Sequence, residues 1–208
     1  IECERDAVRM QRRLGWSSPG NVPALAIPYH PFGRISEAPL CWRYKCDVPR
    51  VEEGKILKYE QALGTQTHIY FPPIISQKDL FETEVPIYMT EGEKKAMAGC
   101  EAGLLCISAP GVYNFHNAQL SDKTRDYFVL KEEILALPLM GRIVYIVFDA
   151  LKFTKPQVLR AEMRLAKMLH EQGAKVHIVH IPSLSSTGDT GLDDLLIATE
   201  AKRCSKSI

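Results

Sequence analysis

The arrangement of hydrophobic and polar residues changes partway along the chain. Up to about residue 80, short apolar runs alternate with Pro, Gly and aromatic residues, as in ALAIPYH, CWRYKC, KILKYEQ and THIYF. Short runs between turn-forming residues predict β-strands, mostly antiparallel, and the turns are expected at PFG and LGT. The first part of the chain is therefore predicted to be a small β-rich α+β subdomain.

After Pro86, strand-like and helix-like patterns alternate. Strands are predicted at PIYMT, LLCIS, RIVYIVFD and KVHIVHIP. Helices are predicted at GEKKAMAGCEA, at SDKTRDYFVLKEEILAL with Ser121 or Asp122 as N-cap, from Pro156 to Gln172, and at LDDLLIATEAK. Such alternation predicts an α/β domain with a parallel sheet and helices on both faces. The predicted domains are residues 1–80 and 81–208.

Acidic residues follow three of the predicted strands or loops. Glu91 follows PIYMT, Asp149 follows RIVYIVF, and Asp193 and Asp194 follow the loop after KVHIVHIP. Ligands bind outside the carboxyl ends of parallel strands, and clustered carboxylates suit Mg²⁺. Alternatively, each acid caps the helix that follows it, where the helix dipole favours negative charge. Three acidic features at one edge favour the ligand site.

The composition is that of an ordinary globular protein. The 208 residues are 46% hydrophobic and 25% charged, with a formal net charge of +1. This balance excludes a global attraction to nucleic acid, so any such binding requires a local basic patch. The six cysteines lack the spacing of a disulfide scaffold or zinc site, and reduced thiols in a cytoplasm are expected. The longest apolar run, residues 143–148, is too short to cross a membrane.

Several motifs, in order, resemble those of a known family. TEGEKKAMAGCEAG, VFDA and GLDDLL resemble the TOPRIM domain of bacterial-type primases, topoisomerases and some nucleases. Upstream, AIPYHPFGRISEAPLCWRYKCDVP and KYEQALGTQTHIYFPP resemble the segment that precedes TOPRIM in those primases. EGEKKA, PGVYNF and GLDDLL are also similar to signatures of a TOPRIM-like domain family, unnamed by function, in plasmid and phage replication proteins. The resemblance extends from about Leu25 to Leu196.

The resemblance implies roles for the acidic residues. Glu91 would match the TOPRIM glutamate, which is catalytic as a general acid or base or is associated with metal, and Gly92 would permit the tight turn after it. Asp149 would match the first acid of Asp-x-Asp. Asp193 and Asp194 would match the downstream acids that help to hold Mg²⁺ or Mn²⁺.

The resemblance also implies contacts with single-stranded DNA and nucleotides. Arg43, Lys58 and Tyr59 match primase positions that line a basic groove, where cations contact phosphates and an aromatic ring stacks on a base. Alternatively, Lys58 and Tyr59 are an exposed strand pair. Lys94, Lys95 and Lys152 are further candidates for binding nucleotide or nucleic acid. Gly111 in PGVYNF marks a turn whose amides either cradle a phosphate or have no ligand.

One position departs from the TOPRIM pattern. The second acid of Asp-x-Asp is replaced by Leu151, and Lys152 and Lys155 follow. Fewer carboxylates and added ammonium groups weaken the binding of a divalent cation. An ammonium group can instead take the place of the metal and pair with Asp149. Alternatively, both lysines point to solvent.

Three functions remain open. The first is a DNA primase module of a plasmid or phage replication protein, which performs metal-dependent nucleotidyl transfer on single-stranded DNA, with a helicase as a possible partner. The second is a TOPRIM-like module that has lost catalysis and binds nucleic acid or protein, for which Leu151 is the main support. The third is a TOPRIM nuclease.

Overall fold

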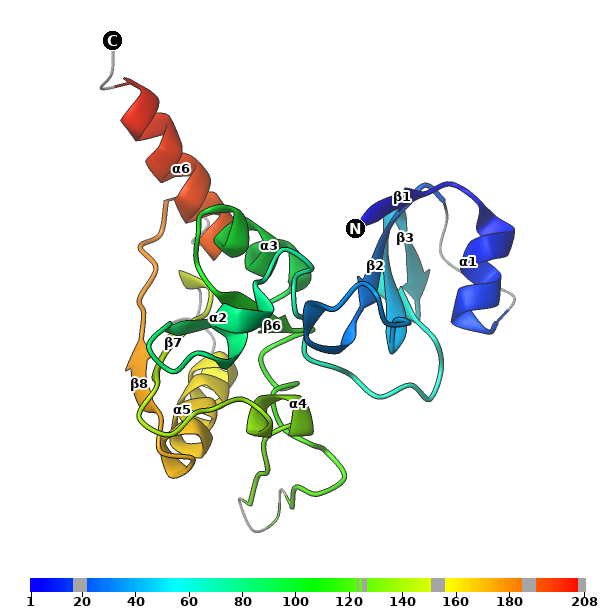
Figure 1. Cartoon of the computed structure of the whole chain (residues 1–208). Coiled ribbons are helices and arrows are strands. Elements are labelled where there is room, and N and C mark those ends of the chain that lie inside the picture. The colour runs from blue at the N-terminus through cyan, green and yellow to red at the C-terminus, as the bar shows by residue number, and fades with distance from the viewer. Residues whose placement is uncertain (17–21, 123, 125–126, 151–155, 185–189, 206–208) are drawn as a thin grey trace. The chain divides into compact units, whose positions relative to one another are not determined.

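The protein is described by a computed structural model of the whole chain (Figure 1). It describes residues 1–16, 22–122, 124, 127–150, 156–184 and 190–205, so Leu151, Lys152 and Lys155 lie outside the described residues. The chain consists of two compact units, Ile1–His68 and Ile69–Ile208. Among the described residues, no helix combines the length and the apolar character that crossing a membrane requires.

The first unit contains a four-stranded antiparallel sheet, which confirms the predicted β-rich subdomain. The strand order is β1-β2-β3-β4. The bounds are β1 (Glu2–Glu4), β2 (Ala24–Tyr29), β3 (Cys41–Glu52) and β4 (Lys55–Gln61), with helix α1 (Ala7–Leu14) and the 3₁₀ turn η1 (Pro31–Gly33). The side chain of Asp6 caps α1 by accepting hydrogen bonds from the amides of Val8 and Arg9.

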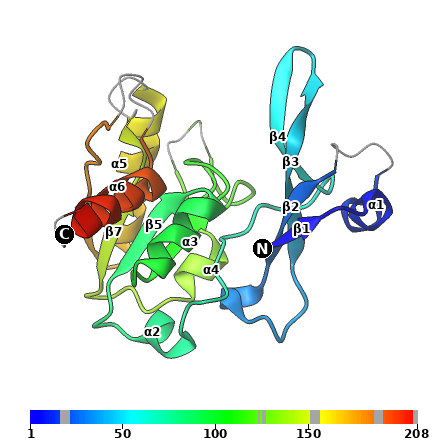
Figure 2. The same cartoon turned by 90° about the horizontal axis from the view of Figure 1, so that it is seen from above.

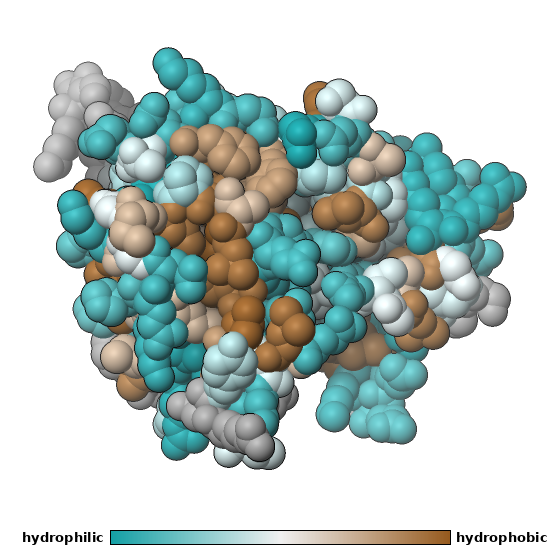
Figure 3. Space-filling view, turned by 60° about the horizontal axis from the view of Figure 1, so that its bottom comes forward, coloured by the Kyte–Doolittle hydropathy of each residue, from teal (hydrophilic) through white to brown (hydrophobic). Residues whose placement is uncertain are grey.

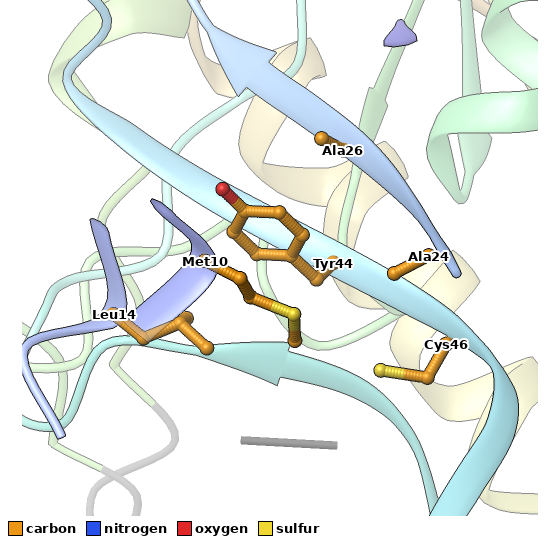
Figure 4. Close-up of a cluster of buried hydrophobic side chains, with 6 residues drawn as sticks. All are labelled: Met10, Leu14, Ala24, Ala26, Tyr44 and Cys46. Atoms are coloured by element: carbon orange, nitrogen blue, oxygen red, sulfur yellow. The ribbon is translucent and has the colours of Figure 1, made fainter. Parts of the chain in front are cut away.

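The core of the first unit lies between α1 and one face of the sheet. Met10 and Leu14 of α1 are buried against Ala24, Ala26, Tyr44 and Cys46 (Figure 4). The alanines lie opposite Cys46 and Tyr44 in the β2–β3 register, so small and large side chains alternate across the two strands. Consequently, alternate residues of β3, including Arg43, project from the other face of the sheet.

The second unit contains a parallel sheet with helices on both faces, as the sequence predicts. The strand order is β6-β5-β7-β8, with β5 (Ile87–Glu91), β6 (Cys106–Ala109), β7 (Ile143–Val147) and β8 (Lys175–Ile178). The helices are α2 (Gln77–Phe81), α3 (Glu93–Glu101), α4 (Glu132–Leu135), α5 (Pro156–Glu171) and α6 (Leu192–Ser205). Helices α3 and α6 lie on one face of the sheet, and α4 and α5 lie on the other (Figures 1 and 2).

The helix predicted to begin at Ser121 or Asp122 is wrong in its first part. Of the described residues in this stretch, only 132–135 form a helix, α4, while Asp122 and Tyr127 form an isolated antiparallel bridge. The carboxylate of Asp122 accepts hydrogen bonds from the amide and the hydroxyl of Thr124. The Ser121 hydroxyl accepts from the Val129 amide. Ser and Asp side chains bind nearby backbone in this way, which competes with helix formation.

Residues just after His68 pack within the second unit. Ile69, Tyr70 and Phe71 are buried, and Tyr70 pairs with Ser108 of β6 through two backbone hydrogen bonds of 2.7 and 3.0 Å. The compact units therefore meet at residues 68/69, whereas the sequence places the boundary at 80/81. The domains 1–80 and 81–208 stay a prediction, because compact packing units need not coincide with independently folding domains.

Candidate functional site

The acidic edge of the parallel sheet lies at a topological switch point. From the central strand β5 the chain goes first to β6 on one side and later to β7 on the other. In sheets of this kind, ligands bind in the crevice outside the carboxyl ends of the two strands where the order reverses. Glu91 is the last residue of β5, and Asp149 follows the end of β7 at Val147. The two predicted acids thus flank this crevice.

Lys95 lies between these two carboxylates. Its ammonium nitrogen is 2.6 Å from each carboxylate oxygen of Asp149 and 3.8 Å from Oε1 of Glu91. The three side chains are only 19–23% exposed, so the charges interact more strongly than a pair on the open surface. Lys95 was one of the residues predicted to bind nucleotide or nucleic acid, but its pairing with Asp149 was not predicted.

The turn between β5 and α3 requires a glycine at position 92. Gly92 has a φ of +84°, a left-handed conformation that is costly for residues with a Cβ. Its amide donates a hydrogen bond of 2.9 Å to the carbonyl of Ala109 at the end of β6. The turn therefore ties the start of α3 to the sheet edge and orients Lys95, on the first turn of α3, toward Asp149.

Gly191 brings a third segment to the same place. A Cβ at Gly191 would lie 2.5 Å from Cε of Lys95, 2.7 Å from Oδ1 of Asp193 and 3.2 Å from Oδ1 of Asp149. The preceding residue, Thr190, accepts a 3.0 Å hydrogen bond from the amide of Ala150, which joins this loop to the one after β7. The sequence did not single out Gly191, although a glycine two residues before a pair of acids, at the start of a predicted helix, was a usable signal.

Asp193 and Asp194 have different surroundings. Asp193 lies beside Gly191, close to Asp149 and Lys95. Asp194 instead accepts a 2.9 Å hydrogen bond from the amide of Gly191, whose carbonyl accepts the amide of Leu195 in the first turn of α6. Asp194 therefore acts as a helix cap, the alternative role for these acids, whereas Asp193 is part of the acidic edge.

Buried polar side chains lie below this edge and were missed from the sequence. Glu93, in the first turn of α3, is 1% exposed, and Thr90 and Ser108 are fully buried neighbours on β5 and β6. Burial raises the pKa of Tyr70, and the nearby charge of Glu93 raises it further. The usable signal for Glu93 was its position two residues after Glu91, at the start of a helix whose dipole favours negative charge.

The carboxylates of the acidic edge are of the kind that binds a divalent metal ion. Carboxylates are the hard oxygen ligands that Mg²⁺ and Mn²⁺ take, and the Asp149 carboxylate is only 19% exposed, with the Lys95 ammonium 2.6 Å away. Within the same part of the chain, however, no three His, Cys, Asp or Glu side chains already converge as a metal site. The acids fit a metal chemically, and the ammonium of Lys95 would have to leave Asp149 for one to bind.

Lys94 and Gly111 are the other described residues that the sequence predicts for a site in the second unit, and Lys152 lies outside the described residues. Lys94 is exposed, and it projects from a different side of α3 than Lys95 does. Gly111 has a φ of +133°, and its amide donates a 2.7 Å hydrogen bond to the carbonyl of Ala109. The Gly111 amide therefore holds a turn.

In the first unit, the structure separates the three predicted nucleic-acid-binding residues. The guanidinium of Arg43 lies 4.4 Å from the ring centroid of Tyr59, and its Nη1 lies 3.4 Å from the hydroxyl of Tyr29. Lys58 is exposed, and strand alternation turns it away from the face that carries Tyr59. Arg43 and Tyr59 thus form a cationic and aromatic pair that excludes Lys58.

Comparison with known proteins gives three results. Residues 78–203 match the family described as Domain of unknown function (DUF3854). An uncharacterized protein of Picosynechococcus sp. (strain ATCC 27264 / PCC 7002 / PR-6) is 32% identical over 190 residues, which cover 76% of this chain and 18% of that protein. The chain therefore spans less than a fifth of this relative's length.

The third result concerns the fold. The crystal structure of the Aquifex aeolicus primase (zinc binding and RNA polymerase domains) superposes with a TM-score of 0.59 and 12% sequence identity, over 99% of this chain and 50% of that one. The fold is therefore primase-like.

Proposed function

The chain belongs to the DUF3854 family, and we propose that it is a primase-type module of a plasmid or phage replication protein. In this proposal it performs nucleotidyl transfer on single-stranded DNA with Mg²⁺ or Mn²⁺ bound at the acidic edge of the parallel sheet. One observation carries the proposal: carboxylates from three separate segments meet at the switch point, with the ammonium of Lys95 among them.

The charge balance at this edge favours a cation. Among the described residues, Glu91, Asp149 and Asp193 carry three formal negative charges at this edge, and Lys95 carries one positive charge. Carboxylates that lie so close together in a partly buried place repel one another. A divalent cation would neutralise them and would also accept phosphate oxygens as ligands. A phosphate group without a cation would add to the repulsion.

The proposal assigns a role to each residue. Asp149 and Asp193 would hold the metal, and Glu91 would act as general acid or base or as a further metal ligand. Lys95, released from Asp149, would contact a phosphate of the nucleotide. A bound Mg²⁺ would supply neutralisation of the triphosphate charge and activation of the attacking hydroxyl.

The first unit would hold the template strand in this proposal. The guanidinium of Arg43 would contact a phosphate, and the ring of Tyr59 beside it would stack on a base. A helicase elsewhere in the replication machinery is the expected partner.

A second candidate is a module that has lost catalysis and binds nucleic acid or protein. The 2.6 Å contact between Lys95 and Asp149 favours it, because a resident ammonium can replace a metal ion. The replacement of the second TOPRIM acid by Leu151 favours it as well. In this case Lys95 is the permanent partner of Asp149, and no divalent cation binds.

Calorimetric titration of Mn²⁺ separates the two candidates. We expect the native chain to bind Mn²⁺ and Asp149→Asn to lose at least about tenfold in affinity, since a metal-ligand carboxylate is removed. Asp194→Asn is the matched control: it removes the same charge from the helix cap and should keep Mn²⁺ affinity within about twofold. Primer-synthesis assays on single-stranded DNA then test for nucleotidyl transfer.

Other outcomes would overturn the first candidate. Mn²⁺ binding that appears only in Leu151→Asp or Lys95→Gln would establish the module that has lost catalysis. Binding of Mn²⁺ with shortening rather than lengthening of a DNA strand would indicate a nuclease.

A further inference from the structure

A hollow of about 700 Å³ lies along helix α5 of the second unit, here called the α5 groove. One side is formed by a continuous face of α5 from Leu159 to Glu171, and the other by Tyr127 and Phe128. Figure 3 looks onto the side of the molecule that carries α4 and α5, where hydrophobic surface is bordered by hydrophilic side chains. None of the residues singled out in the sequence lines this groove.

Large apolar side chains of the α5 groove are exposed. Tyr127 is 59% exposed, Met163 55% and Leu159 39%, and Met168 is buried at the same face of α5. Single exposed apolar residues are common on protein surfaces, but a contiguous set that lines a hollow marks a binding surface. The thioethers of the methionines adapt to the shape of an apolar partner.

The opposite wall of the groove is held in place by an aromatic contact. The guanidinium of Arg164 lies 3.6 Å from the ring centroid of Phe128. The rings of His116 and Phe128 pack edge to face, with 5.1 Å between their centroids. These contacts join α5 to the segment around Phe128. A wall that is already ordered costs less conformational entropy when a partner binds.

The charges around the groove are mainly positive. Arg160, Arg164 and Lys167 line it along α5, and Glu171 is the one acid among the described residues of its lining. Lys167 and Glu171 lie 4.0 Å apart on the surface, a weak pair that a stronger partner can displace. A complementary partner therefore carries acidic residues around an apolar stripe.

The lining favours protein over nucleic acid as the occupant. Tyr, Phe, Met and Arg are the side chains enriched in protein–protein interfaces. Aliphatic and thioether walls give no hydrogen bonds to phosphates, which dominate binding to nucleic acids. The groove follows α5 from residue 159 to 171, about 18 Å at 1.5 Å per residue, which matches about three turns of a second helix.

We propose that the α5 groove is a docking site for an acidic amphipathic helix of a partner protein. Apolar side chains at helical spacing would fill the hollow between Met163, Leu159 and Tyr127. Acidic side chains on either side would pair with Arg160 and Lys167. The α5 groove is distinct from the acidic edge around Lys95, because α5 and α3, which carries Lys95, lie on opposite faces of the sheet (Figure 1).

Fluorescence anisotropy with two labelled helical peptides of about three turns tests the proposal. Both carry Leu or Phe at positions i, i+3, i+4 and i+7, and the remaining positions are Glu in one and Lys in the other. We expect the Glu peptide to bind at least about tenfold more tightly than the Lys peptide. Arg160→Glu should reverse or abolish that preference, since it reverses one charge of the lining.

A charge placed in the apolar wall gives the second arm. Met163→Glu should lower the affinity for the Glu peptide at least about tenfold. His170→Glu is the matched control, because His170 is exposed on the same helix but does not line the groove, and we expect a change within about twofold. Circular dichroism of both variants verifies that they are folded.

Three results would overturn the proposal. The Glu peptide could fail to bind, or it could bind the native chain and Met163→Glu equally. The third result is that a labelled single-stranded oligothymidylate binds instead of the peptide, and that this binding is lost in Met163→Glu. It would identify the α5 groove as a nucleic-acid site.

Discussion

At the scale of single residues, Gly191 shows how a missing side chain shapes the candidate site. The space that its Cβ would fill is bordered by Lys95, Asp193 and Asp149, at 2.5 to 3.2 Å. Side chains in contact at such distances exclude even one added methyl group unless a neighbour moves. The acids and the ammonium therefore approach one another across a position that holds only hydrogen.

Gly191→Ala tests this reading. The atoms that the new methyl group would meet belong to the flexible ends of Lys95 and Asp193, so the side chains should move and the backbone stay. We expect the free energy of unfolding to fall by no more than about 1 kcal/mol, while Mn²⁺ affinity falls about tenfold. Urea unfolding and calorimetry measure the two effects.

Gly99→Ala is the control for this prediction. Its Cβ would lie 2.8 Å from the Cβ of Cys106, an atom fixed to the backbone at the start of β6, and 3.5 Å from Cδ2 of Leu192, an ordinary contact distance. This variant should lose more stability, about 1–3 kcal/mol, and keep its Mn²⁺ affinity. Unchanged Mn²⁺ affinity in Gly191→Ala would show that the glycine serves only the packing of the loop.

At the scale of elements, the short helix α2 depends on a single side chain from elsewhere in the unit. Its five residues are too few to be stable alone. The guanidinium of Arg142, which is fully buried, donates hydrogen bonds to the carbonyls of Asp79, Leu80 and Val85 at 2.7 to 2.8 Å. Burial lowers the pKa of Arg142, and the three carbonyls compensate for the desolvation of its charge.

Arg142→Met should destabilise the protein by about 3 kcal/mol or more, because it leaves three carbonyls, one buried and two partly buried, without this donor. The free energy of unfolding in urea measures the loss. Lys78→Met, which removes a positive charge from an exposed position of α2, should change stability by less than about 0.5 kcal/mol. Similar losses in the two variants would refute a structural role for the Arg142 hydrogen bonds.

At the scale of the whole molecule, the position of residues 69–80 decides where the chain can be divided. Five hydrophobic residues of this segment are buried: Ile69, Tyr70, Phe71, Ile75 and Leu80. The same segment contains two of the carbonyls bound by Arg142. Each fully buried large apolar side chain contributes about 1.5–3 kcal/mol, so the segment as a whole rivals the total stability of an ordinary domain.

Two fragments test this division. We expect residues 69–208 to fold and to unfold cooperatively on heating, whereas residues 81–208 should lack a cooperative transition, because the buried segment is missing. Circular dichroism during heating distinguishes them. Cooperative unfolding of 81–208 at the same midpoint as 69–208 would instead support the domain boundary predicted at 80/81.

Local patterns were enough to predict β2, β3, β4, the strands of the second unit, and the meeting of Glu91 and Asp149 at one sheet edge. They missed β1, and the strand predicted at THIYF is wrong, since it holds only an isolated bridge at Tyr70. Periodicity along the chain depends on neighbouring residues alone, and parallel strands necessarily align their carboxyl ends. The same local rules failed at Ser121, where side chains bind nearby backbone instead of capping a helix. They also left α1 unmarked, since few of its residues are buried.

Only the tertiary structure decided which residues of the candidate site meet. The sequence suggested that lysines after Asp149 could pair with it; these lie outside the described residues, and within them Asp149 pairs with Lys95, 54 residues earlier. It also treated Asp193 and Asp194 alike, whereas one lies at the acidic edge and the other caps α6. These contacts depend on how each helix is rotated against the sheet and where its preceding loop crosses the edge. Such relations join distant parts of the chain and leave no periodic pattern in the sequence.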